Sequence, residues 1–369
     1  MSRRDDGAAE GRGADSPRPA ACLGAPRPEL AVPLGRGRSI LLHRRALAVT
    51  LLLLLAALIV STGALLTGAY RLSAPDAMAV LAGSGGDLDR FIVLDQRLPR
   101  ALAALLVGAL LAVAGAVFQS LSRNPLGSPD IVGFTKGATT GGLVVILLTT
   151  ASSLPMIAMG TILGGFATAA LVVLVALRRD ASGDALILAG IALSQMLAAG
   201  NDYLLARATI ESAEAAKAWQ FGSLNAITWP QVRPLVVAAA LLLPLIAWLG
   251  RPAGILELGD DAATALGLSA ARARGILLGY GVVLAAVCVA VSGPIAFLAL
   301  AAPQLARRAS HSAGIALGAS AAMGALLLAL ADFLAARLLS PFQIPVGLVG
   351  AACGGLYLLW FVGLRGERP

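Results

Sequence analysis

The run ALAVTLLLLLAALIVSTGALLTG, residues 46–68, has no charged side chain and is long enough to cross a lipid bilayer as one helix. Similar apolar runs recur along the chain at nearly regular intervals. A helix suits the bilayer interior because its backbone hydrogen bonds are made within the segment. Ten runs are predicted to span the membrane, and they cover residues 46–68, 100–119, 134–151, 154–178, 184–206, 232–250, 275–292, 294–308, 313–336 and 344–364.

The composition supports the same class of protein. Of 369 residues, 58% are hydrophobic and 13% are charged, with a mean hydropathy of +0.84. A soluble domain carries about 25% charged residues, so a soluble enzyme and a disordered chain are both excluded. The sequence predicts an all-α, polytopic membrane protein with about ten transmembrane helices. Nine or eight helices remain open, because the eighth run is short and only Ser152 and Ser153 separate the third from the fourth.

The ends of the chain differ from its middle. Residues 1–45 are rich in proline, arginine and glycine and have no apolar period, which predicts a disordered cytoplasmic tail. Residues 46–364 form the predicted transmembrane domain, and residues 365–369 a short cytoplasmic tail. Arginine and lysine are more frequent in the connections on the side of the two chain ends. The positive-inside rule therefore places both the N-terminus and the C-terminus in the cytoplasm.

Glycines and prolines within the apolar runs suggest close helix packing and broken helices. Gly108, Gly115, Gly160, Gly164, Gly165, Gly318 and Gly324 are predicted to let helix backbones approach one another. Proline breaks at Asn124-Pro125 and Gly293-Pro294 must border protein or a water-filled cavity. Ala112–Gly115 and Ala290–Gly293 resemble each other and lie in predicted spans of opposite direction, so an inverted repeat is one interpretation and chance similarity the other.

Residues for catalysis are missing. His43 and His311 are the two histidines, and no nucleophile pairs with a base at catalytic spacing. A phosphate-binding loop needs Gly-x-x-x-x-Gly-Lys followed by Ser or Thr, but Gly137 follows Lys136 and Ala218 follows Lys217. We therefore expect no enzyme, no metal site and no cofactor on this chain, and any ATP-driven step must use a separate subunit. Nucleic-acid binding is not expected either, because the arginines are not gathered in one soluble segment.

An ordered set of short motifs, covering roughly residues 46–364, resembles the permease family of ABC importers for iron–siderophores and vitamin B12. The motifs are Arg97-Leu98-Pro99-Arg100, Gly115-Ala116-Val117-Phe118-Gln119, Asn124-Pro125-Leu126, Ser128-Pro129-Asp130, Gly222-Ser223-Leu224, Ala265-Leu266-Gly267, Gly293-Pro294-Ile295, Ala302-Pro303, Ala331-Asp332 and Ile344-Pro345-Val346-Gly347. Two features depart from the family. Gln304 stands where many relatives have histidine, and the arginine-rich N-terminal tail is unusually long.

The resemblance implies a multi-pass subunit of the bacterial plasma membrane. Two permease chains would form the membrane dimer, with a heterodimer favoured over a homodimer. Two ATP-binding subunits would hold ATP-Mg, and an extracytoplasmic binding protein would deliver the cargo. The implied substrate is a ferric siderophore, towards which the segment from Gly222 to Asn225 points, while vitamin B12 and haem remain open.

Family motifs and the local sequence together predict two contact regions. By resemblance, Arg97, Arg100 and Arg337 dock acidic residues of the binding protein, since guanidinium groups form forked hydrogen bonds with carboxylates. Interfacial anchoring of the three arginines is the competing interpretation. The segment proposed to contact the ATPase contains Asp260, Asp261, Ala265, Leu266, Gly267, Leu268 and Ser269. Asp260 is expected to cap the start of a short helix that extends to Leu266. Gly267 is expected to end that helix, and Ser269 to cap the start of the next one.

Five polar or proline residues are candidates for the translocation pathway, namely Gln119, Asn124, Pro125, Asp202 and Asp332. Packing or capping competes with this role at the first three, and a chance position near the membrane interface competes at Asp202. A structural hydrogen bond competes at Asp332, because an ionisable group within the membrane is costly unless paired or wet. The main alternative function is an ion-coupled secondary transporter, in which Asp202 and Asp332 would carry protons. Two isolated carboxylates make a weak proton relay, which counts against the ion-coupled transporter. The two hypotheses also differ in that the ion-coupled transporter needs no partner subunit, whereas an importer permease does.

Overall fold

The computed structural model describes residues 29–33, 39–68, 70, 72–130, 133–149, 153–177, 183–312, 314–339 and 342–363. The chain divides into two units, Met1–Arg44 and Arg45–Pro369, and each is described by itself.

In the first unit, β1 (Glu29–Pro33) pairs antiparallel with β2 (Ser39–His43). The segment predicted to be disordered therefore contains a hairpin, built from two short apolar runs on either side of Gly35 and Gly37. Arg44 and Arg45 of that predicted tail begin α1, whereas its residues 1–28 and 34–38, and the predicted tail at residues 365–369, lie outside the described residues.

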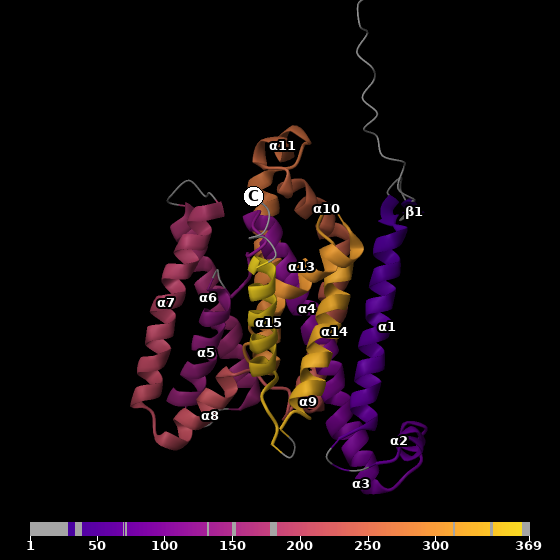
Figure 1. Cartoon of the computed structure of the whole chain (residues 1–369). Helices are drawn as coiled ribbons and strands as arrows, with labels where there is room; N and C mark the ends of the chain where they lie inside the picture. The colour runs from indigo at the N-terminus through magenta and orange to yellow at the C-terminus, as the bar shows by residue number, and fades with distance from the viewer. Residues whose placement is uncertain are drawn as a thin grey trace, which may run out of the picture. The chain divides into compact units, whose positions relative to one another are not determined.

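Helices are the regular secondary structure of the second unit in its described residues, and turns and irregular segments connect them (Figure 1). Its longer helices are α1 (Arg44–Leu66), α4 (Leu98–Ser122), α5 (Phe134–Leu148), α6 (Leu154–Leu177), α7 (Gly183–Arg207), α9 (Trp229–Leu242), α10 (Ile246–Glu257), α12 (Ala270–Ser292), α13 (Leu298–Ser310), α14 (Leu317–Ala335) and α15 (Val346–Gly363). The shorter ones are α2 (Ala74–Leu81), α3 (Asp87–Arg90), the π-helix η1 (Phe91–Arg97), α8 (Ile210–Gln220), the 3₁₀-helix η2 (Leu243–Leu245) and α11 (Asp260–Ala265).

Each predicted span overlaps one of these helices, so the prediction of a polytopic helical membrane protein is confirmed. Six stretches of the described chain are long and apolar enough to cross a bilayer, and they are Arg44–Leu66, Asp87–Ser122, Leu154–Val172, Trp229–Glu257, Ala270–Ser292 and Leu317–Ala335. The predicted span 294–308 is wrong as a crossing helix. The helix there, α13, has 13 residues, about 20 Å at 1.5 Å per residue, against a hydrocarbon core of about 30 Å.

The start of α13 explains the difference. Gly293 and Phe297 both adopt a positive φ, 71° and 64°, and Pro294 lies between them. A left-handed backbone and a proline each interrupt a right-handed helix. The chain therefore leaves α12, turns and begins the half-length helix α13, as the Gly-Pro signal indicates.

The helices present two distinct ends (Figure 1). The short helix α11 lies at the same end as the last turn of α15 and the start of α1, and we name this the α11 end. The short helices α2, α3 and α8 lie at the opposite end, which we name the α8 end. The two ends of the helical unit therefore share one side, in keeping with the orientation predicted from arginine and lysine.

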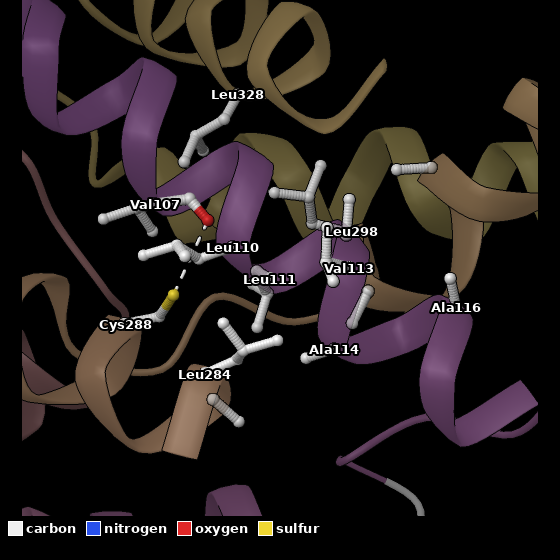
Figure 2. Packing of buried hydrophobic residues seen from close by; sticks show 14 of the residues in the cluster. Val107, Leu110, Leu111, Val113, Ala114, Ala116, Leu284, Cys288, Leu298 and Leu328 are labelled. Atoms are coloured by element: carbon white, nitrogen blue, oxygen red, sulfur yellow. Dashed lines mark hydrogen bonds between the residues drawn. The ribbon is translucent and has the colours of Figure 1, made fainter. Parts of the chain in front are cut away.

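Helix α4 forms the centre of the unit, and nearly all of its residues are buried. It packs against α12, α13 and α14, and Figure 2 shows Val107, Leu110 and Leu111 of α4 among Leu284, Leu298 and Leu328 of those neighbours. The Cys288 thiol donates to the Val107 carbonyl over 3.6 Å (Figure 2). The burial follows from the many alanines and glycines of α4, because small side chains let neighbouring helix backbones come close.

The closest approaches occur at glycines. A Cβ atom on Gly108 would lie 2.3 Å from the Gly324 carbonyl oxygen, and one on Gly115 would lie 1.7 Å from that of Ala299. In the same way, Gly160 and Gly164 of α6 face α5 at distances that exclude a side chain. The packing predictions for these glycines are confirmed, whereas such a Cβ on Gly318 would have no neighbour within 4 Å in the part of the chain that the structure describes.

Candidate functional site

Three arginines that lie far apart in the sequence surround one hollow at the α8 end. Arg97 ends η1, Arg100 lies in the first turn of α4, and Arg337 follows α14. The hollow has a volume of about 480 Å³, and its wall also includes Asp332, Asn225 and Gln343. The residues predicted to dock a binding protein are therefore brought together in space.

Arg100 is bound to a carboxylate of this chain. Its Nε lies 3.0 and 2.9 Å from the two Asp332 carboxylate oxygens, and its Nη2 lies 2.9 Å from Oδ1. The side chains are 17% and 7% exposed. Asp332 was a pathway candidate that needed a partner, and the structure supplies that partner from α4, so the competing prediction of a structural hydrogen bond is confirmed.

Arg97 and Arg337 donate to backbone carbonyls around the C-terminal end of α1. Arg97 reaches Leu65 O over 2.7 Å and Tyr70 O over 2.8 Å. Arg337 reaches Thr67 O over 3.0 Å and also contacts the Thr67 hydroxyl. The guanidinium of Arg337 lies 3.6 Å from the centre of the Phe333 ring, which holds it by a cation–π contact.

The cluster carries excess positive charge. Three guanidinium groups line the hollow, and Asp332 is the carboxylate among its lining residues. Burial, together with the nearby charges of Arg100 and Arg97, lowers the pKa of Arg337. A site of this kind attracts a carboxylate or another anion, because guanidinium groups have several donors and form strong charge-assisted hydrogen bonds.

The predicted ATPase-contact segment forms a compact turn at the α11 end (Figure 1). Helix α10 ends at Glu257, α11 covers Asp260–Ala265, and α12 begins at Ala270. Gly267 follows with φ of 79°, and its N–H donates to Thr264 O while Leu268 N–H donates to Ala263 O. These two bonds close the C-terminal end of α11, as predicted for Gly267.

Two details of the capping prediction are wrong. Gly259, with φ of 104°, precedes the helix, so Asp260 is its first residue rather than its cap. The Asp260 carboxylate instead accepts from Arg274 Nη2 of α12 over 2.6 Å. Ser269 does precede α12, but its side chain makes no capping hydrogen bond. Asp261 and Leu266 are respectively in the first turn of α11 and just beyond it, and Leu266 is 63% exposed.

Gln119, Asn124 and Pro125 take part in a polar network near the end of α4. Gln119 is 4% exposed and donates to Leu300 O of α13 over 3.0 Å. Gln304 donates to Gln119 Oε1 over 2.8 Å and to Pro125 O over 3.1 Å. Asn124 accepts from Leu126 N–H over 2.9 Å. Gln119 is thus packed and bonded within the unit, whereas Asn124 is partly exposed and Pro125 is exposed. A pathway role for the three residues stays a prediction.

Asp202 lies apart from these clusters. It is an exposed residue of α7, next to Asn201, whose buried Oδ1 has no hydrogen-bond partner among the described residues. In the described residues no group of three His, Cys, Asp or Glu side chains could hold a metal ion.

Several partners were beyond sequence reasoning. The sequence marks Gln304 only as a departure from the family and Asn225 only as part of a segment that indicates the substrate, and it gives no role to Gln343 or Tyr70. Gln343 and Asn225 belong to connections between helices, and polar residues in such connections are common. No local signal marks them as neighbours of Arg100 or Arg97.

Comparisons with known proteins agree along nearly the whole helical unit. The model of the FecCD transport family matches residues 52–363. The chain is 43% identical to the ferric enterobactin transport system permease protein FepG of Escherichia coli, over 87% of this chain and 97% of that protein. It is 36% identical to the Fe(3+)-citrate import system permease protein YfmE of Bacillus subtilis, over 88% and 98% of the two chains.

A solved structure shows the same fold. A metal-chelate type ABC transporter in an inward-facing conformation superposes with a TM-score of 0.77 and 31% identity. The superposition covers 85% of this chain and 98% of that one.

Proposed function

The chain belongs to the FecCD transport family, and on that premise we propose that it moves ferric siderophores across the bacterial plasma membrane as the permease subunit of an ABC importer. The proposed substrate rests on the 43% identity to the ferric enterobactin permease, over 87% of this chain and 97% of that protein. The citrate relative widens the class to other ferric chelates. The chain is a multi-pass transporter subunit, and ATP hydrolysis belongs to another subunit.

The substrate class is tested by iron uptake. Cells that lack this chain should fail to take up ⁵⁵Fe from a ferric siderophore, and the intact chain should restore uptake. Replacement of the phosphate-binding lysine in the companion ATPase should abolish uptake again. Solute accumulation by the purified chain alone in liposomes would instead support the ion-coupled transporter.

We further propose the assembly that the family implies. Two permease chains, with a heterodimer favoured, would bind two ATPase subunits that hold ATP-Mg at the α11 end and one binding protein at the α8 end. The pathway between the permeases would include Asp202, because its side chain is exposed on α7 rather than used within the unit. Gln119, Asn124 and Pro125 would border the pathway beside the first half of α13, the helix that is too short for a full crossing.

Docking of the binding protein is assigned to the arginine cluster. Its excess positive charge favours acidic residues on the partner, and the hollow gives such residues room to approach. Electrostatic association slows as salt screens the charges. We therefore expect the association rate of the binding protein with the purified importer to fall about tenfold or more between 50 and 500 mM NaCl. An association rate independent of salt would contradict docking by this cluster.

Coupling to the ATPase is assigned to α11 and the residues that follow it. The turn is internally bonded, joined to α12 through Asp260 and Arg274, and exposes Leu258 and Leu266. A compact element of this kind can transmit the movement of a partner to α10 and α12.

The backbone at Gly267 offers a test of coupling. Proline requires a φ near −65° and cannot adopt the observed 79°, whereas asparagine tolerates a positive φ. We expect Gly267→Pro to lower siderophore uptake about tenfold or more while ATP hydrolysis continues, and Gly267→Asn to retain most uptake. Normal uptake by the proline variant, at normal membrane abundance, would argue against the assignment.

A further inference from the structure

The helix α1 is weakly held along most of its length. Only 11% of its most apolar stretch is buried, compared with 83% for the stretch that contains α4. Its contacts with the core use mainly small residues, with Ala57 and Ser61 buried and Gly63 facing Phe333, and Leu53 adds one larger, partly buried side chain. The hydrophobic effect does not drive helix association in lipid, where packing and hydrogen bonds hold helices together. Because α1 has little packed area, its position depends strongly on hydrogen bonds.

Those interactions are concentrated at its C-terminal end. The last carbonyls of a helix have no N–H partner within the helix. Arg97 supplies donors to Leu65 O and Tyr70 O, and Arg337 supplies donors to Thr67. The two guanidinium groups come from the base of α4 and from the end of α14, and both reach the same end of α1.

We propose that Arg97 and Arg337 are positioning residues that tie the C-terminal end of α1 to α4 and α14. A guanidinium is a flat fork whose separate N–H groups can reach two acceptors at once, as Arg97 does with Leu65 O and Tyr70 O. Its positive charge also complements the negative C-terminal end of the helix dipole. The ammonium of lysine keeps the charge but lacks the fork.

The neighbouring residues are shaped for this contact. A Cβ on Gly68 would lie 2.6 Å from Arg97 Nη2, so glycine leaves the room that the guanidinium occupies. Phe333 supports the other guanidinium by its ring. Both arginines are thus held in a defined geometry by the surrounding chain.

The tie at the end of α1 also affects the position of α2. Leu66 at the end of α1 and Leu72 beyond it pack against the small cluster of Ala77, Val80 and Val93, which joins α2 to η1. A displaced end of α1 would therefore move α2 as well. The inference does not rest on a binding protein, because it concerns contacts within this chain.

The test compares lysine variants by hydrogen–deuterium exchange of the full chain in lipid nanodiscs. The double variant Arg97→Lys/Arg337→Lys retains the charge and loses the forked contacts. We expect amide exchange across residues 63–82 to be about tenfold faster or more than in the wild type, with exchange in α4 and α14 unchanged. Arg233→Lys is the matched control, since Arg233 is an exposed residue of α9, and it should exchange as the wild type does.

Two results would overturn the tie. Amide exchange within about twofold of the wild type across residues 63–82 would mean that a positive charge alone holds the end of α1 and that the forked guanidinium contacts are not needed. Faster exchange throughout α4 and α14 would mean that the arginines support the whole fold rather than the end of α1. Gly68→Ala gives an independent check, because it should displace Arg97 and speed exchange in the same segment without changing any charge. Binding-protein capture by the lysine variants is measured separately, so that failed docking leaves the exchange result standing.

Discussion

Gly115→Ala is expected to displace α13 and abolish transport. The new methyl carbon would lie 1.7 Å from the Ala299 carbonyl oxygen, far inside van der Waals contact. That oxygen belongs to the backbone and cannot rotate away as a side chain could. Pro303, four residues later in α13, lacks the N–H that would otherwise bond this carbonyl. The carbonyl therefore faces α4, where a glycine leaves room for it.

The expected cost is roughly 3 kcal/mol or more, at the upper end of what overpacking costs, because two backbones must separate. It should appear as a lower Tm of the purified protein and as loss of siderophore uptake. Gly165→Ala is the matched control, since its nearest neighbour would lie 3.5 Å away in ordinary contact. Equal Tm values for the two variants would show that α4 and α13 are not packed as the structure has them.

Arg100→Met should destabilise the protein strongly, and a second substitution should reverse much of the loss. The single change leaves the Asp332 carboxylate, 7% exposed, without the guanidinium that binds it. Breaking a buried ion pair from one side costs roughly 3–5 kcal/mol, whereas replacing both partners by apolar groups is often nearly neutral. We therefore expect Arg100→Met/Asp332→Leu to be more stable than Arg100→Met.

A double-mutant cycle on the free energy of unfolding measures this coupling. Arg233→Met is a suitable control because that arginine is exposed. If Arg100→Met is as stable as Arg233→Met, the pair contributes little to the fold. The remaining role of Arg100 would then be docking, which binding-protein capture by the same variants measures.

The membrane class and the positions of most helices were predictable from local sequence. An uncharged run such as residues 46–68 has to be helical in a bilayer, because its backbone groups find no other hydrogen-bond partners there. The breaks at Gly293-Pro294 and Gly267 were predictable for a different reason, namely that few residues adopt those backbone angles. The run at residues 294–308 was recognised as short but was still counted as a crossing, because hydropathy continues across the break that turns the chain.

The candidate site was predictable in its residues and not in its contacts. Motifs singled out Arg97, Arg100 and Arg337, but each was expected to face a partner protein. The structure shows one guanidinium bound to Asp332 and two bound to the end of α1. The prediction that Asp260 caps α11 was also wrong. Asp260 is the first residue of the helix, and its carboxylate accepts a hydrogen bond from Arg274, fourteen positions later.

The amino-acid sequence by itself determined that this chain is a bundle of membrane helices with glycine contacts and basic ends, since these properties follow from runs of neighbouring residues. Tertiary structure alone decided which charge meets which. Arg100 and Asp332 are 232 positions apart in the chain, and no local pattern relates them. They meet because the small residues of α4 let α14 pack closely beside it, and that packing brings the two ends of these helices to one hollow.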